Sequence, residues 1–135
     1  MSNDNNNLAF VHEEWVLEVR KTYRGPFCPE NMRLVITCSE GDDDESHRDV
    51  RLVLVPDQQE KLQAWLVSNE SLKLTLTDDD CTLTLLRCAT GLDVECLDSQ
   101  TWIPKPTKIE IKMTLDLEEV ENLTQWLAQP FELRN

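Results

Sequence analysis

Glycine is scarce in this sequence: only Gly25, Gly41 and Gly91 occur among 135 residues. A loop that cradles phosphates needs several closely spaced glycines, and neither GxGxxG nor GxxxxGKS/T is present. Histidine is equally rare, with His12 and His47 alone, and the GxSxG and HExxH patterns are absent. We therefore expect a protein that is not an enzyme and that carries no cofactor.

Long apolar runs are also missing. No stretch approaches 18 apolar residues, the least expected of a helix that spans a membrane. The first seven residues, MSNDNNN, are polar and aperiodic, so we expect residues 1–7 to be a disordered terminus and residues 8–135 to be a single domain. Since no basic segment precedes an apolar one, we expect no export and a cytoplasmic location.

The cysteines follow no metal-binding or disulfide pattern. There are five, at positions 28, 38, 81, 88 and 96, and none forms a CxxC pair. An odd number without such a pair argues against a disulfide framework and against a zinc site. We expect all five to be free thiols, with Cys38 and Cys96 as small hydrophobic side chains on the apolar side of their strands.

Basic residues are half as numerous as acidic ones. Thirteen Lys and Arg face 26 Asp and Glu, a net charge of −13 that both halves of the chain share. Nucleic acids and anionic membranes are bound through Lys and Arg, so this balance disfavours both as direct partners. It favours a basic protein partner. The alternative is that the charge serves solubility alone.

Alternation of apolar and polar residues is the dominant pattern, and it is typical of strands with one buried face. Seven segments show it, with apolar residues near 15–19, 32–38, 50–54, 72–76, 83–85, 92–96 and 109–113. Asp78-Asp79-Asp80 and Ala89-Thr90-Gly91 lie between neighbouring segments at the spacing of hairpin turns. The pattern therefore predicts an antiparallel sheet.

Two segments have helical periodicity instead, PDQQEKLQAWLVSN (56–69) and DLEEVENLTQWLAQP (116–130). Each carries an apolar stripe that contains a tryptophan, Trp65 in the first and Trp126 in the second, and we expect both in the core. The spacing of Asp57 with Glu60, and of Asp116 with Glu119, predicts a capping box at each helix start.

The two regions also resemble each other. An offset of 61 residues aligns Trp65 with Trp126 and Val50 with Ile111. This predicts two pseudo-repeated halves, each of several strands followed by a helix; chance similarity is the alternative. The expected fold is therefore α+β, a predominantly antiparallel sheet of about seven strands covered by two amphipathic helices.

The function expected from these features is that of a small acidic interaction module or inhibitor. It would dock on a basic surface, as toxin-neutralising, counter-defence or nucleic-acid-mimicking proteins do. The alternative is an enzyme or small-ligand-binding domain whose site is assembled from scattered residues. No acidic run has the ligand spacing of an EF-hand, so we expect no metal site. The acidic residues expected to bind the partner are Asp42, Asp43, Asp44, Glu45, Asp78, Asp79, Asp80, Glu118, Glu119 and Glu121.

Overall fold

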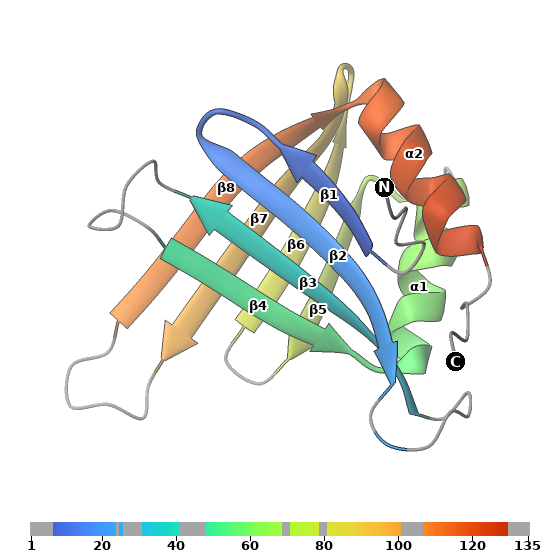
Figure 1. Ribbon diagram of the computed structural model, residues 1–135. Coiled ribbons are helices and arrows are strands. Elements are labelled where there is room, and N and C mark those ends of the chain that lie inside the picture. Colours follow the sequence, from blue (N-terminus) through green and yellow to red (C-terminus); the bar gives the residue numbers. More distant parts are fainter. Residues whose placement is uncertain are drawn as a thin grey trace, which may run out of the picture.

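Two four-stranded antiparallel sheets, each followed by a helix, make up the fold (Figure 1). The computed structural model describes residues 7–23, 25, 31–40, 48–68, 71–78, 81–100 and 107–129. The first sheet, sheet A, contains β1 (Asn7–Val11), β2 (Trp15–Tyr23), β3 (Met32–Glu40) and β4 (Arg48–Leu54), and α1 (Pro56–Val67) follows it. The second, sheet B, contains β5 (Lys73–Asp78), β6 (Cys81–Cys88), β7 (Gly91–Gln100) and β8 (Thr107–Asp116), and α2 (Leu117–Ala128) follows it.

The expected α+β class is confirmed, but the expected single sheet of about seven strands is corrected to eight strands in two sheets. The missed strand is β1, which begins at Asn7. It turns only two apolar side chains inward, Leu8 opposite Val19 and Phe10 opposite Leu17. β1 has five residues and begins at the end of the polar run MSNDNNN, so its short alternation does not stand out from the terminus.

The arrangement of the layers also differs from expectation. The inner faces of the two sheets pack against each other, and α1 and α2 lie together at one end of the sandwich rather than over a sheet (Figure 1). Trp65 and Trp126 are each 7% exposed, which confirms them as core residues. Within the described residues, no helix is long and apolar enough to cross a membrane.

The second half of the fold repeats the first. In both sheets the strands pair in chain order, and the ladder of β3 and β4 matches that of β7 and β8. Cys38 pairs with Val50 in one, and Cys96 pairs with Ile111 in the other. The expected alignment of Val50 with Ile111 is therefore a true structural correspondence, and Cys38 and Cys96 occupy equivalent positions.

The two equivalent cysteines meet in the core, where both are 0% exposed and are joined by a disulfide across 58 residues of sequence. The expectation that every cysteine is free is wrong for this pair. Neither the odd count nor the spacing could reveal it, because the pairing depends on how the two sheets stack. Cys81 and Cys88 are in no disulfide with another described residue, and Cys28 lies outside the described residues.

Local signals predicted one helix start correctly and one incorrectly. At α2, Asp116 Oδ1 accepts the backbone N–H of Glu119 at 2.8 Å, and Glu119 Oε1 accepts that of Asp116 at 3.0 Å, so this capping box is confirmed. At α1, the N-cap is Val55, and Gln58 Oε1 accepts its backbone N–H at 3.1 Å. Asp57 thus lies in the first turn of the helix, two residues after the N-cap, rather than at the cap itself.

The hairpin between β6 and β7 is also confirmed, with Cys88 opposite Gly91. Gly91 has a φ of +150°, and a Cβ atom there would lie 1.9 Å from the carbonyl oxygen of Leu115. Only glycine lets β7 begin this close to the end of β8.

Candidate functional site

The outward face of sheet A presents side chains that form rows across the strands. Because register places one residue of each strand in a row, Glu18, Thr37 and Arg51 share a row across β2, β3 and β4. The adjacent row contains Arg20, Val35 and Val53. Val35 is only 8% exposed, although it points outward with its row. The arginine side chains are longer than the valine and threonine side chains of these rows, so they project beyond them.

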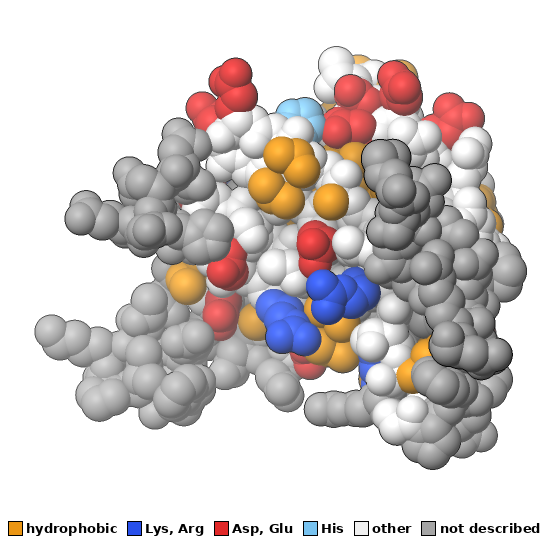
Figure 2. All heavy atoms as spheres, viewed as in Figure 1, with side chains coloured by type: hydrophobic (Ala, Val, Ile, Leu, Met, Phe, Trp, Pro, Cys, Tyr) orange, Lys and Arg blue, Asp and Glu red, His pale blue; other side chains and the backbone are white. Residues whose placement is uncertain are grey.

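Arginines gather on this face of an acidic protein, together with the acidic residues Glu18 and Asp49. Figure 2 shows Lys and Arg side chains in the middle of the face, with carboxylates around them. Arg51 is exposed, and no other described residue forms an ion pair or hydrogen bond with it. The side chain of Arg20 is 57% exposed and contacts Glu18 at 3.5 Å. Arg33 is anchored on the Met32 carbonyl oxygen at 2.7 Å.

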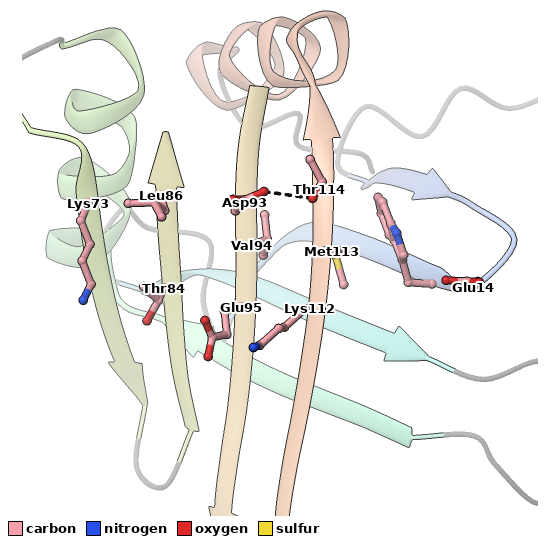
Figure 3. Close-up of a pocket in the computed structure, with 11 residues that line it drawn as sticks. Glu14, Lys73, Thr84, Leu86, Asp93, Val94, Glu95, Lys112, Met113 and Thr114 are labelled. Atoms are coloured by element: carbon pink, nitrogen blue, oxygen red, sulfur yellow. Dashed lines mark hydrogen bonds between the residues drawn. The ribbon is translucent and has the colours of Figure 1, made fainter. Parts of the chain in front are cut away.

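The outward face of sheet B carries a groove of about 660 Å³ (Figure 3). The side chains of its floor also form a row across the strands. Thr84 of β6 pairs with Glu95 of β7, and Glu95 pairs with Lys112 of β8. These three positions correspond to Glu18, Thr37 and Arg51 of sheet A by the repeat. Threonine and glutamate have exchanged places between the two faces.

That exchange changes the electrostatics of the groove. Glu95 is the direct ladder partner of Lys112, and Figure 3 shows the Lys112 side chain reaching toward Glu95. Lys112 Nζ also forms an ion pair with Glu110 Oε1 at 3.1 Å. The hydrogen bond to Glu110, the charge of Glu110 and the charge of Glu95 together raise the pKa of Lys112. The positive charge at this position is thus compensated by its neighbours.

One end of the groove is closed by the turn between β1 and β2. Trp15 lines the groove and stacks on His12, with ring centroids 4.0 Å apart and planes 19° from parallel. His12 Nε2 lies 2.8 Å from Glu119 Oε2 on α2. This contact ties the turn to the first turn of α2, so the aromatic wall of the groove is held by the helix.

The acidic residues expected to bind a partner have several different roles. Asp78 ends β5 and its Oδ2 accepts the backbone N–H of Val53 at 2.8 Å, so it links β5 to β4. Glu119 caps α2 and contacts His12. Glu118 and Glu121 are exposed on α2. The remaining members lie outside the described residues: Asp42, Asp43, Asp44, Glu45, Asp79 and Asp80.

Arg20 and Arg51 were not among the expected site residues. Their signal in the sequence is weak but real: each occupies a polar position of an alternating strand. That pattern predicts an outward direction, yet it cannot show that the two side chains share a face. Only the pairing of β2 with β3 and of β3 with β4 does so.

Comparisons with known proteins relate this chain to others by fold alone. No protein-family model and no curated protein sequence matches it. Among solved structures, the crystal structures of MRP1/MRP2 from Trypanosoma brucei match with a TM-score of 0.59 at 12% identity, over 90% of this chain and 79% of that chain. A guide-RNA-binding protein complex bound to a guide RNA matches with the same TM-score and identity, over 90% of this chain and 85% of that one.

These matches correct the expectation that the chain has no direct nucleic-acid partner. A fold of this kind occurs in a protein complex that holds a guide RNA. The expectation relied on net charge, which averages over the whole surface. It overlooked the outward face of sheet A, where arginines are concentrated while most acidic residues lie elsewhere.

Proposed function

We propose that this protein binds single-stranded nucleic acid on the outward face of sheet A. The observation that carries the proposal is the exposure of Arg20 and Arg51 in the middle of that face. The fold similarity to a guide-RNA-binding complex supports it. Guanidinium groups bind phosphates through paired hydrogen bonds, and their planes also stack on unpaired bases.

The shape and surroundings of the face favour a single strand. Val53 is partly exposed in the row of Arg20 and offers an apolar surface to an unstacked base, while the arginines reach the backbone. The acidic surface elsewhere repels phosphates, so a bound strand is confined to this face. We expect modest affinity with a shallow dependence on salt, because few phosphates are contacted.

Sheet A is a better candidate than sheet B because of how its charges are arranged. On sheet B, Lys112 is engaged by Glu110 and faces Glu95. On sheet A, the equivalent Arg51 is separated from Glu18 by Thr37 and stays available for an anionic ligand.

The test is fluorescence anisotropy of a labelled oligouridine at several salt concentrations. The double variant Arg20→Ser/Arg51→Ser should weaken binding and reduce the slope of log K against log salt by about 1.4, the value for two lost phosphate contacts on a single strand. The matched control is Lys73→Ser/Lys112→Ser on the opposite face, which removes the same charge. Equal losses in the two double variants, or no binding by the unaltered protein, would refute the proposal.

A second candidate is the acidic interaction module expected from the sequence. The observation that favours it is the exposure of Glu118 and Glu121 on α2, with Asp116 at the helix start. A basic protein docked there would be released by salt and by the Glu118→Gln/Glu121→Gln variant, which leaves sheet A untouched. Affinity capture from cytoplasm, the location we propose, with this variant beside the unaltered chain tests the idea.

A further inference from the structure

The row of Glu18, Thr37 and Arg51 brings an acceptor and a donor group to opposite sides of one small side chain. Strand spacing places the Cα atoms of Glu18 and Arg51 about 10 Å apart, with Thr37 midway. Both outer side chains are long and Thr37 is short. The position of Thr37 therefore lies between a residue that carries a carboxylate and one that carries a guanidinium, and both side chains are long enough to reach over it.

The carboxylate is held in place yet keeps an available oxygen. Arg20 Nη2 contacts Glu18 Oε1 at 3.5 Å, and the Glu18 side chain is 37% exposed. Within the described residues, Glu18 Oε2 accepts no hydrogen bond. A carboxylate on a face that binds anions is unfavourable electrostatically unless the ligand offers donors to it.

Among the four RNA bases, guanine best supplies both hydrogen-bond donors for the Glu18 carboxylate and acceptors for the Arg51 guanidinium. Its N1–H and N2–H groups are adjacent donors, which suit the two oxygens of a carboxylate. Its O6 and N7 atoms are adjacent acceptors, which suit the paired N–H groups of arginine. Uracil offers one ring donor between two acceptors, so a carboxylate that accepts its N3–H also faces two oxygens.

We infer that the protein reads one guanine above Thr37, with Glu18 accepting from N1 and N2 and Arg51 donating to O6 and N7. This inference rests on the proposed binding of a single strand to sheet A. It adds base selectivity, which phosphate contacts alone do not provide. Arg20 is then a positioning residue, since it orients Glu18 and contacts the backbone of the strand.

Sheet B provides an internal control for this geometry. There the acceptor, Glu95, lies directly next to Lys112 rather than one strand away, and the small residue, Thr84, lies to one side. No third side chain therefore stands between the two charged residues in their row. The variants Glu95→Gln and Lys112→Arg are therefore matched controls for Glu18→Gln and Arg51→Lys.

The experiment measures binding of the full chain to an oligouridine 12-mer and to the same 12-mer with one central guanosine, adenosine or cytidine. We expect the guanosine oligomer to bind at least about 10-fold more tightly than oligouridine, since each of the two bidentate pairs can contribute about that factor. Glu18→Gln should abolish this preference while oligouridine binding is kept or strengthened, because a negative charge is removed. Arg51→Lys should also abolish it and keep most of the oligouridine affinity.

Each outcome has one meaning. Loss of the guanosine preference in both sheet A variants, with no change in the sheet B controls, supports the inference. Equal binding of all four oligomers by the unaltered protein overturns it but leaves strand binding intact. Absence of binding to every oligomer overturns the proposed function as well. Melting temperatures of the variants show whether any loss reflects unfolding instead.

Discussion

Lys21 and Arg87 occupy equivalent positions in the two halves of the fold. Each donates hydrogen bonds to the C-terminal end of the helix that belongs to the other half. Lys21 Nζ donates to the carbonyl oxygens of Trp126 at 2.7 Å and Gln129 at 2.8 Å, at the end of α2. Arg87 Nη2 donates to the corresponding carbonyl oxygens of Trp65 and Ser68, at the end of α1.

Each cation also stands over the tryptophan of the helix that it closes. Lys21 Nζ is 4.4 Å from the ring centre of Trp126, and Arg87 Cζ is 4.3 Å from that of Trp65. The last carbonyl groups of a helix lack intrahelical partners and carry partial negative charge, so a cation there is favourable. The two halves are interlocked by this exchange.

Replacing Lys21 with methionine should lower the free energy of unfolding by about 2–3 kcal/mol, because two helix-end carbonyls lose a charged donor in a buried setting. Chemical denaturation measures the change. Lys61→Met, at an exposed position of α1, should cost less than about 0.5 kcal/mol. Similar losses for the two variants would show that the contacts of Lys21 are not the cause.

Stability should rise with pH in the alkaline range through the same side chain. Burial lowers the pKa of Lys21 from its ordinary 10.5. Between the lowered pKa and 10.5 the unfolded chain binds more protons than the folded protein, so the free energy of unfolding increases with pH there. Denaturation curves of the parent protein and of Lys21→Met at several pH values isolate this effect. An identical pH dependence in both would contradict it.

The two helix starts should respond differently to loss of an aspartate. Asp116→Ala removes the side chain that accepts the Glu119 N–H, and we expect a loss of about 1 kcal/mol. Asp57→Ala removes a residue whose sequence spacing also predicts a cap but which lies inside α1, so only a few tenths of a kcal/mol should be lost. Thermal unfolding of both variants tests this, and equal effects would refute the assignment of the caps.

The disulfide can be tested by differential alkylation of unreduced, denatured protein. Cys81 and Cys88 should react without reductant, whereas Cys38 and Cys96 should react only after reduction. Closing a loop of 58 residues should stabilise the fold by about 4 kcal/mol relative to the reduced chain in the chain-entropy description. Alkylation of Cys38 or Cys96 before reduction would show that they are thiols.

The sequence by itself determined the elements whose signals are local. The stripes containing Trp65 and Trp126 predicted two helices, and the Asp116–Glu119 spacing predicted a capping box that is present. Period-two alternation predicted seven of the eight strands, because apolar residues recur at every second position in each of those seven segments. The offset of 61 residues indicated the repeat, because equivalent elements bury equivalent side chains.

Only the tertiary structure decided how these elements pair and stack. The division into two sheets, the meeting of Cys38 with Cys96 and the sharing of one face by Arg20 and Arg51 all depend on strands far apart in the chain. Alternation assigns each side chain to one side of its own strand, but not to a neighbour on another strand. Register supplies that neighbour, and it is set by how the two inner faces pack together. Net charge is a property of the whole chain and argued against nucleic acid as a partner, whereas the fold gathers arginines on one face.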